Sequence, residues 1–205
     1  RAAAPVLAVG LLPLLLNARS ASRAGQTFTR DFAYDMLDSV APNGILITNG
    51  DNDTFPLWYA QTVEGHRRDV AVIVATYLGT DWFPKQLMRR GVTLAATPAE
   101  ADSVPEVMRL DTPERFDAGA IHATIRPGYV TRDQLFVLRM VRDVLPVRPM
   151  YFSNAAYPNA LGLGPYLVTE GLAVRLMPDT VVESATVART DGGMVDVPRS
   201  LALWR

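Results

Sequence analysis

Two short apolar stretches, each preceded and followed by helix-like segments, constrain the fold of this chain most strongly. Residues 45–48 and 70–76 are apolar or β-branched along their whole length, which is typical of strands covered on both faces of a parallel sheet. Apolar residues recur at helical spacing from Phe28 to Val40. The segments 55–63 and 82–90 each carry an early proline, which a helix tolerates in its first turn. The order of these segments predicts strands that alternate with helices.

The second half of the chain continues this pattern after an interruption. Residues 91–128 are rich in Pro, Asp and Thr, and we expect an irregular insertion with short strands over 92–95 and 121–125. A helix over 134–145, a third core strand over 149–153 and a strand pair within 166–176 follow. Alternating strands and helices predict a parallel sheet with right-handed crossovers. The expected fold is α/β, a small three-layer Rossmann-like domain with a mostly parallel sheet.

Composition excludes several classes of function. The formal net charge is -1 with acids and bases interspersed, so nothing indicates a nucleic-acid partner. The chain has no cysteine, which excludes thiol catalysis, disulfides and thiolate metal sites. His66 lies in a charged turn and is interpreted as a solvated loop residue, and His122 as a structural histidine. Without a matching acidic spacing they do not form a zinc pattern, so neither a metal nor a cofactor is expected.

The N-terminal residues are strongly apolar. Residues 2–16 carry no charge, but the run is shorter than the roughly 20 residues that a complete bilayer crossing needs. We interpret residues 1–16 as the end of a last transmembrane helix; a signal peptide and a buried helix are the alternatives. Residues 17–27 are small and polar, as in a juxtamembrane linker. The α/β domain then spans 28–178, and 179–205 is expected to be an extension that leads to a missing region.

Polar residues follow the ends of the expected core strands. Ligands of open parallel sheets bind beyond the carboxyl ends of the strands, where these residues are expected to converge on one rim. The ligand-rim candidates are Asn49, Asp51, Asn52, Asp53, Thr54, Asp81, Trp82 and Asn154. Asp51 and Asp53 form an acidic pair, but turn formation and helix capping account for these residue types as well. Our hypothesis is that Asp51 points into the crevice near Asp81 and Asn154, while Asp53 mainly caps the following helix. No catalytic residue is assigned.

One segment is specific enough to indicate a family. Residues 49–61 read NGDNDTFPLWYAQ, and this block, with Arg68-Asp69-Val70, closely resembles bacterial multipass membrane proteins of formerly unknown function. Thr80-Asp81-Trp82 and the segment from Glu170 to Leu176 fit the same pattern. That family is related to protein O-mannosyltransferases, which are glycosyltransferases that depend on lipid-phosphate sugars. The resemblance implies a membrane domain before this chain and a helical-repeat region after it.

The resemblance also implies a function and a location. The catalytic loop of such enzymes lies in the membrane domain, so this chain is expected to be an inactive accessory fragment at the bacterial inner membrane, with its soluble domain on the extracytoplasmic side. Its expected partners are its own membrane domain, the helical-repeat region, the lipid bilayer and a protein or glycan acceptor. Two alternatives remain open. In the first alternative, the chain is a packing module without a ligand. In the second, it is a metal-dependent nucleotide-sugar transferase that uses Asp51 and Asp53.

Overall fold

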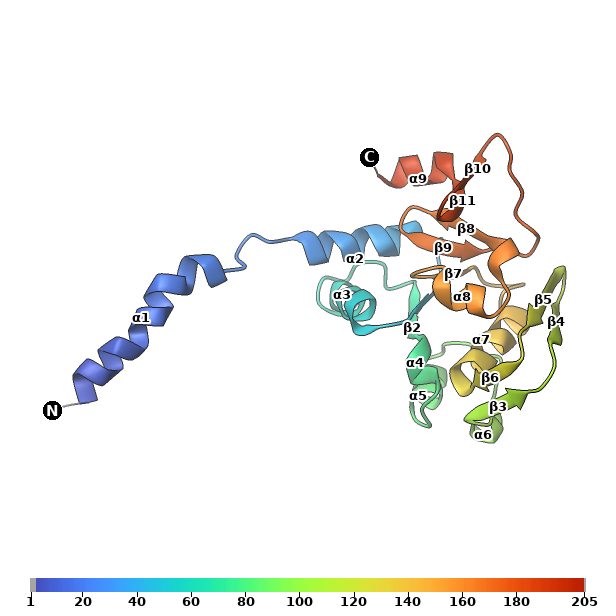
Figure 1. Cartoon of the computed structure of the whole chain (residues 1–205), viewed down its shortest axis with the longest axis horizontal. Helices are drawn as coiled ribbons and strands as arrows, with labels where there is room; N and C mark the ends of the chain where they lie inside the picture. The colour runs from blue at the N-terminus through green and yellow to red at the C-terminus, as the bar shows by residue number, and fades with distance from the viewer. Residues whose placement is uncertain (1–2, 205) are drawn as a thin grey trace.

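A seven-stranded mixed sheet forms the centre of the molecule (Figure 1). The computed structural model describes the backbone of residues 3–204 and the side chains of residues 9–204. The strands follow one another across the sheet in the order β10 (Val187–Thr190), β11 (Gly193–Asp196), β8 (Leu167–Glu170), β9 (Ala173–Leu176), β7 (Met150–Phe152), β1 (Ile45–Thr48) and β2 (Ala71–Val74).

The prediction of a mostly parallel, Rossmann-like sheet is wrong. Only β1 follows the predicted pattern on both sides, since it is parallel to β2 and to β7. β9 is antiparallel to both β7 and β8, β10 is antiparallel to β11, and a single residue pair joins β11 to β8 in parallel. The physical reason is the connection lengths: parallel neighbours need a long crossover, whereas Gly171 and Leu172 alone connect β8 to β9. Gly171 has a φ of 64°, which suits a tight hairpin turn.

Successive side chains of a strand point to opposite faces of the sheet, so the apolar parallel strands need cover on both faces. Helices supply this cover on each face. Leu46, Val72 and Tyr151 pack with α2 (Phe28–Ser39) and α3 (Asp51–Thr62). Ile45 and Ile73 belong to a second, larger core that contains residues of the other main helices. These helices are α4 (Ala75–Leu78), α5 (Phe83–Arg89), α6 (Pro98–Ser103) and α7 (Arg132–Asp143).

The region 91–128 is more regular than its composition indicates. β3 (Val107–Leu110) pairs with β6 (Gly128–Thr131), and β4 (Glu114–Ala118) pairs with β5 (Ile121–Ile125), both antiparallel. The strand expected over 121–125 is confirmed, and its residues alternate between buried and exposed. Residues 92–95 form no strand, and Ala95 has a positive φ of 55°.

Short elements complete the C-terminal half. α8 (Ala156–Ala160) and the 3-10 turn η1 (Gly164–Tyr166) connect β7 to β8, and α9 (Val197–Leu203) follows β11. Gly171 lies between α9 and α2. Its N–H donates to Ser200 Oγ of α9 at 3.0 Å, and a Cβ at this position would lie 2.4 Å from Ser39 Oγ of α2. The segment after β9 therefore joins the same sheet and packs against α2.

The expected end of a transmembrane helix also needs correction. α1 (Ala3–Ala21) lies away from the body of the molecule in Figure 1, with residues 1 and 2 outside the described part. Its apolar run ends at Leu16, and the helix continues through Asn17 with Arg19 in its last turn. Among the described residues, no helix combines the length and the apolar character that a membrane crossing requires.

Candidate functional site

The predicted polar loop 49–54 is largely the first turn of α3. Gly50 precedes the helix with an extended backbone (φ −144°, ψ 178°). The Asp53 carboxylate reaches back and accepts the N–H groups of Asn49 at 3.1 Å and Gly50 at 2.9 Å. This is one half of a capping box, because Gly50 has no side chain to supply the other half. The helix therefore starts earlier than the proline in its first turn suggested.

Asp53 also connects two strands of the sheet. The Ser153 hydroxyl, just beyond β7, donates to the Asp53 carboxylate. The Ser153 N–H donates to Ile47 C=O of β1 at 2.9 Å. Asn49, Gly50, Asp53 and Ser153 are called the Asp53 cluster below. Three of the roughly four lone-pair positions of this carboxylate are occupied within the cluster, so Asp53 stabilises the rim.

The side chains of Thr54 and Asn154 also form hydrogen bonds within the chain. Thr54 is fully buried, and its hydroxyl lies 2.6 Å from Gly50 C=O and 2.7 Å from the Thr48 hydroxyl. Asn154 Oδ1 accepts the N–H of Ala156 at 3.0 Å, at the start of α8. Both side chains satisfy polar groups where strands give way to helices.

Asp51 faces another part of the molecule. Together with Asn52 it lines a groove of about 540 Å³ between the first turns of α2 and α3. Phe28, Phe32 and Phe55 supply much of the apolar lining. Within the described residues, no hydrogen bond joins the Asp51 carboxylate to Asp81 or Asn154. The capping role expected for Asp53 is confirmed, since its carboxylate accepts the Gly50 N–H at the start of α3. The hypothesis is wrong for Asp51, which faces the groove at Phe28 and Phe55.

Asp81 and Trp82 lie at the start of α5, next to α7. Asp81 accepts a hydrogen bond from the Arg132 guanidinium at 2.5 Å, and the same guanidinium donates to Ala101 C=O at 2.6 Å. Arg132 is buried, whereas Asp81 is exposed. The Trp82 ring packs edge-on against Phe83 with centroids 5.4 Å apart and is half exposed. The rim candidates are therefore divided among three places and do not converge on one crevice.

This arrangement gives the rim little capacity for acid–base or metal chemistry. Asp53 and Asp81 are each bound to a partner within the chain, and Asp51 lies apart from both. Across the described residues, no cluster of three or more His, Asp or Glu side chains has the geometry of a metal site.

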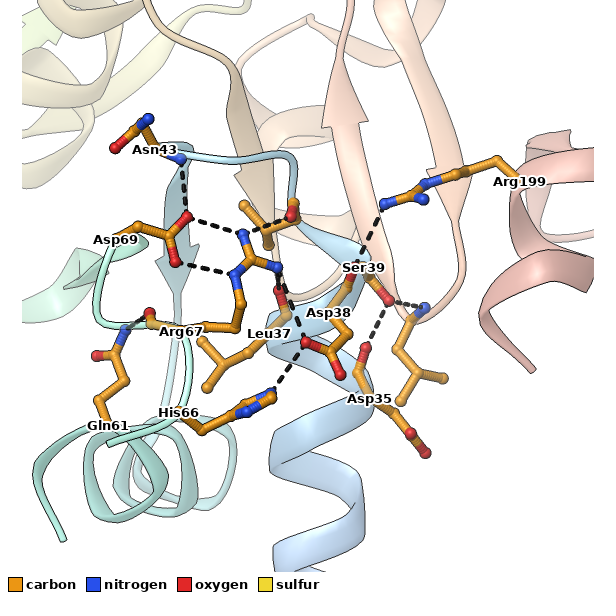
Figure 2. A network of polar contacts seen from close by, with 12 residues as sticks. Asp35, Leu37, Asp38, Ser39, Asn43, Gln61, His66, Arg67, Asp69 and Arg199 are labelled. Carbon is orange, nitrogen blue, oxygen red and sulfur yellow. Dashed lines mark hydrogen bonds and ion pairs between the residues drawn. The ribbon is translucent and has the colours of Figure 1, made fainter. Parts of the chain in front are cut away.

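A second polar network lies near the start of β1 and β2 (Figure 2). The Arg67 guanidinium donates to Leu37 C=O and Val40 C=O, both at 2.9 Å, at the C-terminal end of α2. It also binds both oxygens of Asp69, which accepts the Asn43 N–H at 2.9 Å. These five residues are called the Arg67 network below. Hydrogen bonding to Arg67 lowers the pKa of Asp69 well below its ordinary value.

Sequence reasoning missed this network. His66 is not a solvated loop residue: its ring stacks on Tyr34 with centroids 3.8 Å apart, and Nε2 lies 2.9 Å from an Asp38 oxygen. The unpaired carbonyls at the end of a helix require donors, but they do not identify which residue supplies them. His122, conversely, lies on the exposed face of β5 beside Asp117 at 2.6 Å, rather than among apolar residues.

The segment from Glu170 to Leu176 has a structural role in the sheet. Glu170 is buried and accepts hydrogen bonds from the Tyr151 hydroxyl and from Arg175, each at 3.0 Å. Burial, with the nearby Glu170 carboxylate, raises the pKa of Tyr151 to about 12. This group ties the hairpin β8–β9 to β7.

Comparison with known proteins assigns the family. The model of a family described as TMEM260-associated domain 2 matches residues 29–105 and 106–197. The chain belongs to this family. Neither the curated proteins nor the solved structures contain a match. The resemblance inferred from the sequence is thus confirmed at the level of a TMEM260-like family, which suggests membrane association. The relation to protein O-mannosyltransferases and the bacterial origin stay predictions.

The two matched segments of the TMEM260-associated domain form one unit. The first contains β1 and β2, and the second contains β7 to β11, so both contribute strands to the same sheet. The boundary at residue 105 falls just before β3. The match ends at Val197, the first residue of α9, and leaves α1 outside.

Proposed function

We propose that this TMEM260-associated domain is an accessory domain of a membrane-embedded glycosyltransferase that resembles protein O-mannosyltransferases. In this proposal the donor sugar is transferred by the membrane part of the enzyme, and the domain holds or orients the acceptor. The family assignment supports the link to a membrane-protein family. The contacts of Asp53 and Asp81 support an accessory role, because both carboxylates are bound within the chain.

The observation that carries the proposal is an exposed apolar surface on one side of the molecule. Phe28 at the start of α2 is 83% exposed, and Phe55 and Tyr59 of α3 are about half exposed. Two grooves, of about 480 and 540 Å³, meet at Phe55 and Pro56 between these helices. The leucines of α1 at positions 11, 12 and 14–16 are exposed as well. Monomeric proteins in water rarely leave such a patch uncovered.

The residues around this patch fit a membrane interface. Aromatic side chains are enriched where lipid meets water, and basic side chains nearby bind anionic headgroups. Arg19 and Arg23 lie between the α1 leucines and Phe28. We propose that this surface contacts the membrane domain and the adjoining lipid, on the extracytoplasmic side of a bacterial inner membrane. The proposed C-terminal helical-repeat region follows α9.

The exposed rim candidates are the residues that this proposal assigns to acceptor contact. Asn49, Asp51, Asn52 and Trp82 are exposed, and Asp51 and Asn52 line the same groove as Phe28 and Phe55, so in this proposal the acceptor lies next to the membrane contact. Asp53 and Thr54 are bound within the rim. The alternative, a packing module without a ligand, predicts that substitution of these exposed residues leaves transfer unchanged. The contacts disfavour a nucleotide-sugar transferase, since Asp51 and Asp53 face different parts of the molecule.

Transfer of mannose from a lipid-phosphate donor by the intact membrane enzyme tests the proposal. The double substitution Phe28→Ser and Phe55→Ser should reduce transfer and weaken binding of the chain to membranes. The control is Tyr129→Ser, which removes an exposed aromatic side chain from β6, away from α2 and α3 (Figure 1). Sugar transfer by the isolated 205-residue chain would contradict the accessory role.

A further inference from the structure

The free edge of the sheet at β2 opens into a groove of about 740 Å³ between α3 and α5. β2 is the last strand of the sheet, so within residues 3–204 one side of its backbone has no neighbouring strand. Ala71 N–H donates to Gly44 C=O, on the side of β1. Because alternate residues of a strand direct their backbone groups to opposite sides, the N–H and C=O of Val72 face the groove. Gln61 Nε2 covers the neighbouring Val70 C=O at 2.8 Å.

The groove carries positive charge that no ion pair within the described residues neutralises. Arg68, Arg90 and Arg148 line it. Arg68 donates to the carbonyls of Gln61 and Thr62, and Arg148 to those of Asn43 and Gly44. Among the side chains of residues 9–204, none of these three guanidinium groups forms an ion pair with a carboxylate. The one acidic residue in the lining, Asp69, is bound on both oxygens by Arg67.

Aromatic side chains form the rest of the wall. Trp58 of α3, Tyr77 of α4 and Trp82 at the start of α5 follow one another with ring centroids 6.5 and 6.1 Å apart. Phe83 and Leu87 continue the apolar lining. Trp82 is about half exposed, so part of this wall is accessible to a partner.

We propose that this groove binds an extended acidic peptide segment of a partner protein. The main chain of the segment pairs with the backbone of Val72 and adds a short strand to the edge of the sheet, as edge strands do in β-augmentation. Its carboxylates pair with Arg68 and Arg90, and its apolar side chains pack on Trp58 and Trp82. Charge complementarity selects this occupant, because the groove combines unneutralised guanidinium groups with a free strand edge. The inference does not depend on glycosyl transfer.

Nuclear magnetic resonance of the 205-residue chain tests the proposal. The probe is a capped five-residue peptide that alternates glutamate and valine. It should shift the Val72 amide signal and slow its hydrogen exchange, and it should shift the indole signals of Trp58 and Trp82. Trp204, beyond α9, is an internal control whose indole signal should not move. A peptide with lysine in place of glutamate should not bind.

Two variants and a methylated peptide separate the contributions. Arg90→Glu should weaken binding of the acidic peptide on the order of fivefold, as the loss of an exposed ion pair predicts. Arg109→Glu, an exposed site on β3, should leave binding unchanged. Methylation of the central peptide nitrogen should abolish the protection of Val72.

Three outcomes would overturn the inference. Equal binding of the acidic and basic peptides would remove the electrostatic argument, and unchanged Val72 exchange would remove the added strand. If Arg90→Glu instead weakens binding to phosphatidylglycerol vesicles and leaves peptide binding intact, the groove is a lipid site. Since sugar transfer is not measured in these experiments, their failure is distinguishable from failure of the proposed function.

Discussion

The Asp53 cluster and the Arg67 network lie at opposite ends of the parallel strands and fasten the same strands by different means. At the carboxyl ends, one aspartate accepts two backbone N–H groups and a hydroxyl. At the amino ends, one arginine donates to two helix carbonyls and to an aspartate. Apart from Ser153, the Asp53 cluster joins residues that are close in sequence. The Arg67 network joins residues about 30 positions apart. A run of polar residues in the sequence therefore indicated the Asp53 cluster, but no such run marks the Arg67 network.

The largest expected effect is on the Arg67 network. Arg67→Ala removes the donors of two helix carbonyls and the partner of Asp69, so the free energy of unfolding should fall by about 3 kcal/mol. Urea denaturation measures this change. Arg68→Ala is the matched control, because its guanidinium is exposed and binds only carbonyls. A smaller loss for Arg67→Ala than for Arg68→Ala would show that the network does not fasten α2.

A smaller loss is expected in the Asp53 cluster. Asp53→Ala should cost about 1.5 kcal/mol, the range of a helix cap that also holds a second partner. Ser153→Ala removes one of the three hydrogen bonds and should cost less than Asp53→Ala. Thermal melts of both variants check the order. If the two variants lose the same stability, the contact between β1 and β7 carries the whole effect and the cap carries none.

Acid should distinguish the two regions. Since the pKa of Asp69 is lowered by Arg67, this carboxylate contributes stability above its ordinary pKa of about 4, and the contribution is lost as pH falls below that value. Asp69→Asn should therefore destabilise the chain at neutral pH and flatten its loss of stability in acid. Urea midpoints from about pH 7 to about pH 2.5 measure this. A parallel shift at every pH would contradict the assignment.

The smallest effect on stability is expected at Asp51, the rim aspartate outside both regions. Asp51→Asn should change the free energy of unfolding by less than about 0.5 kcal/mol, because Asp51 is exposed and its side chain forms no hydrogen bond with the residues that the structure describes. Under the proposed function it should still reduce transfer by the intact enzyme. Unchanged transfer with Asp51→Asn, Asn52→Ala and Trp82→Ala together would favour the packing module.

The sequence predicted the elements better than their arrangement. The strand at 45–48 and the helix from residue 28 follow local patterns and lie where the patterns predict. The mixed sheet depends on the two-residue turn at Gly171 and Leu172, which makes β8 and β9 antiparallel. The alternation of strands and helices earlier in the chain had predicted parallel strands. Similarly, Asp51 and Asp53 are chemically equivalent in sequence. Only the entry angle of α3, set at Gly50, directs one toward Ser153 and the other toward Phe28.

The pairing of β1 with β7 has a consequence for the order of folding. Ile45 lies opposite Met150, so more than a hundred residues separate the two sides of this contact, whereas β8 and β9 are joined by a two-residue turn. Closing so long a loop costs entropy before any strand contact compensates for it, and non-local pairing of this kind slows folding. The hairpin β8–β9 is therefore expected to form early and to bring β7 to β1 late. During synthesis, β1 leaves the ribosome well before β7, and the side of β1 that faces β7 stays unpaired until residue 152 has been made.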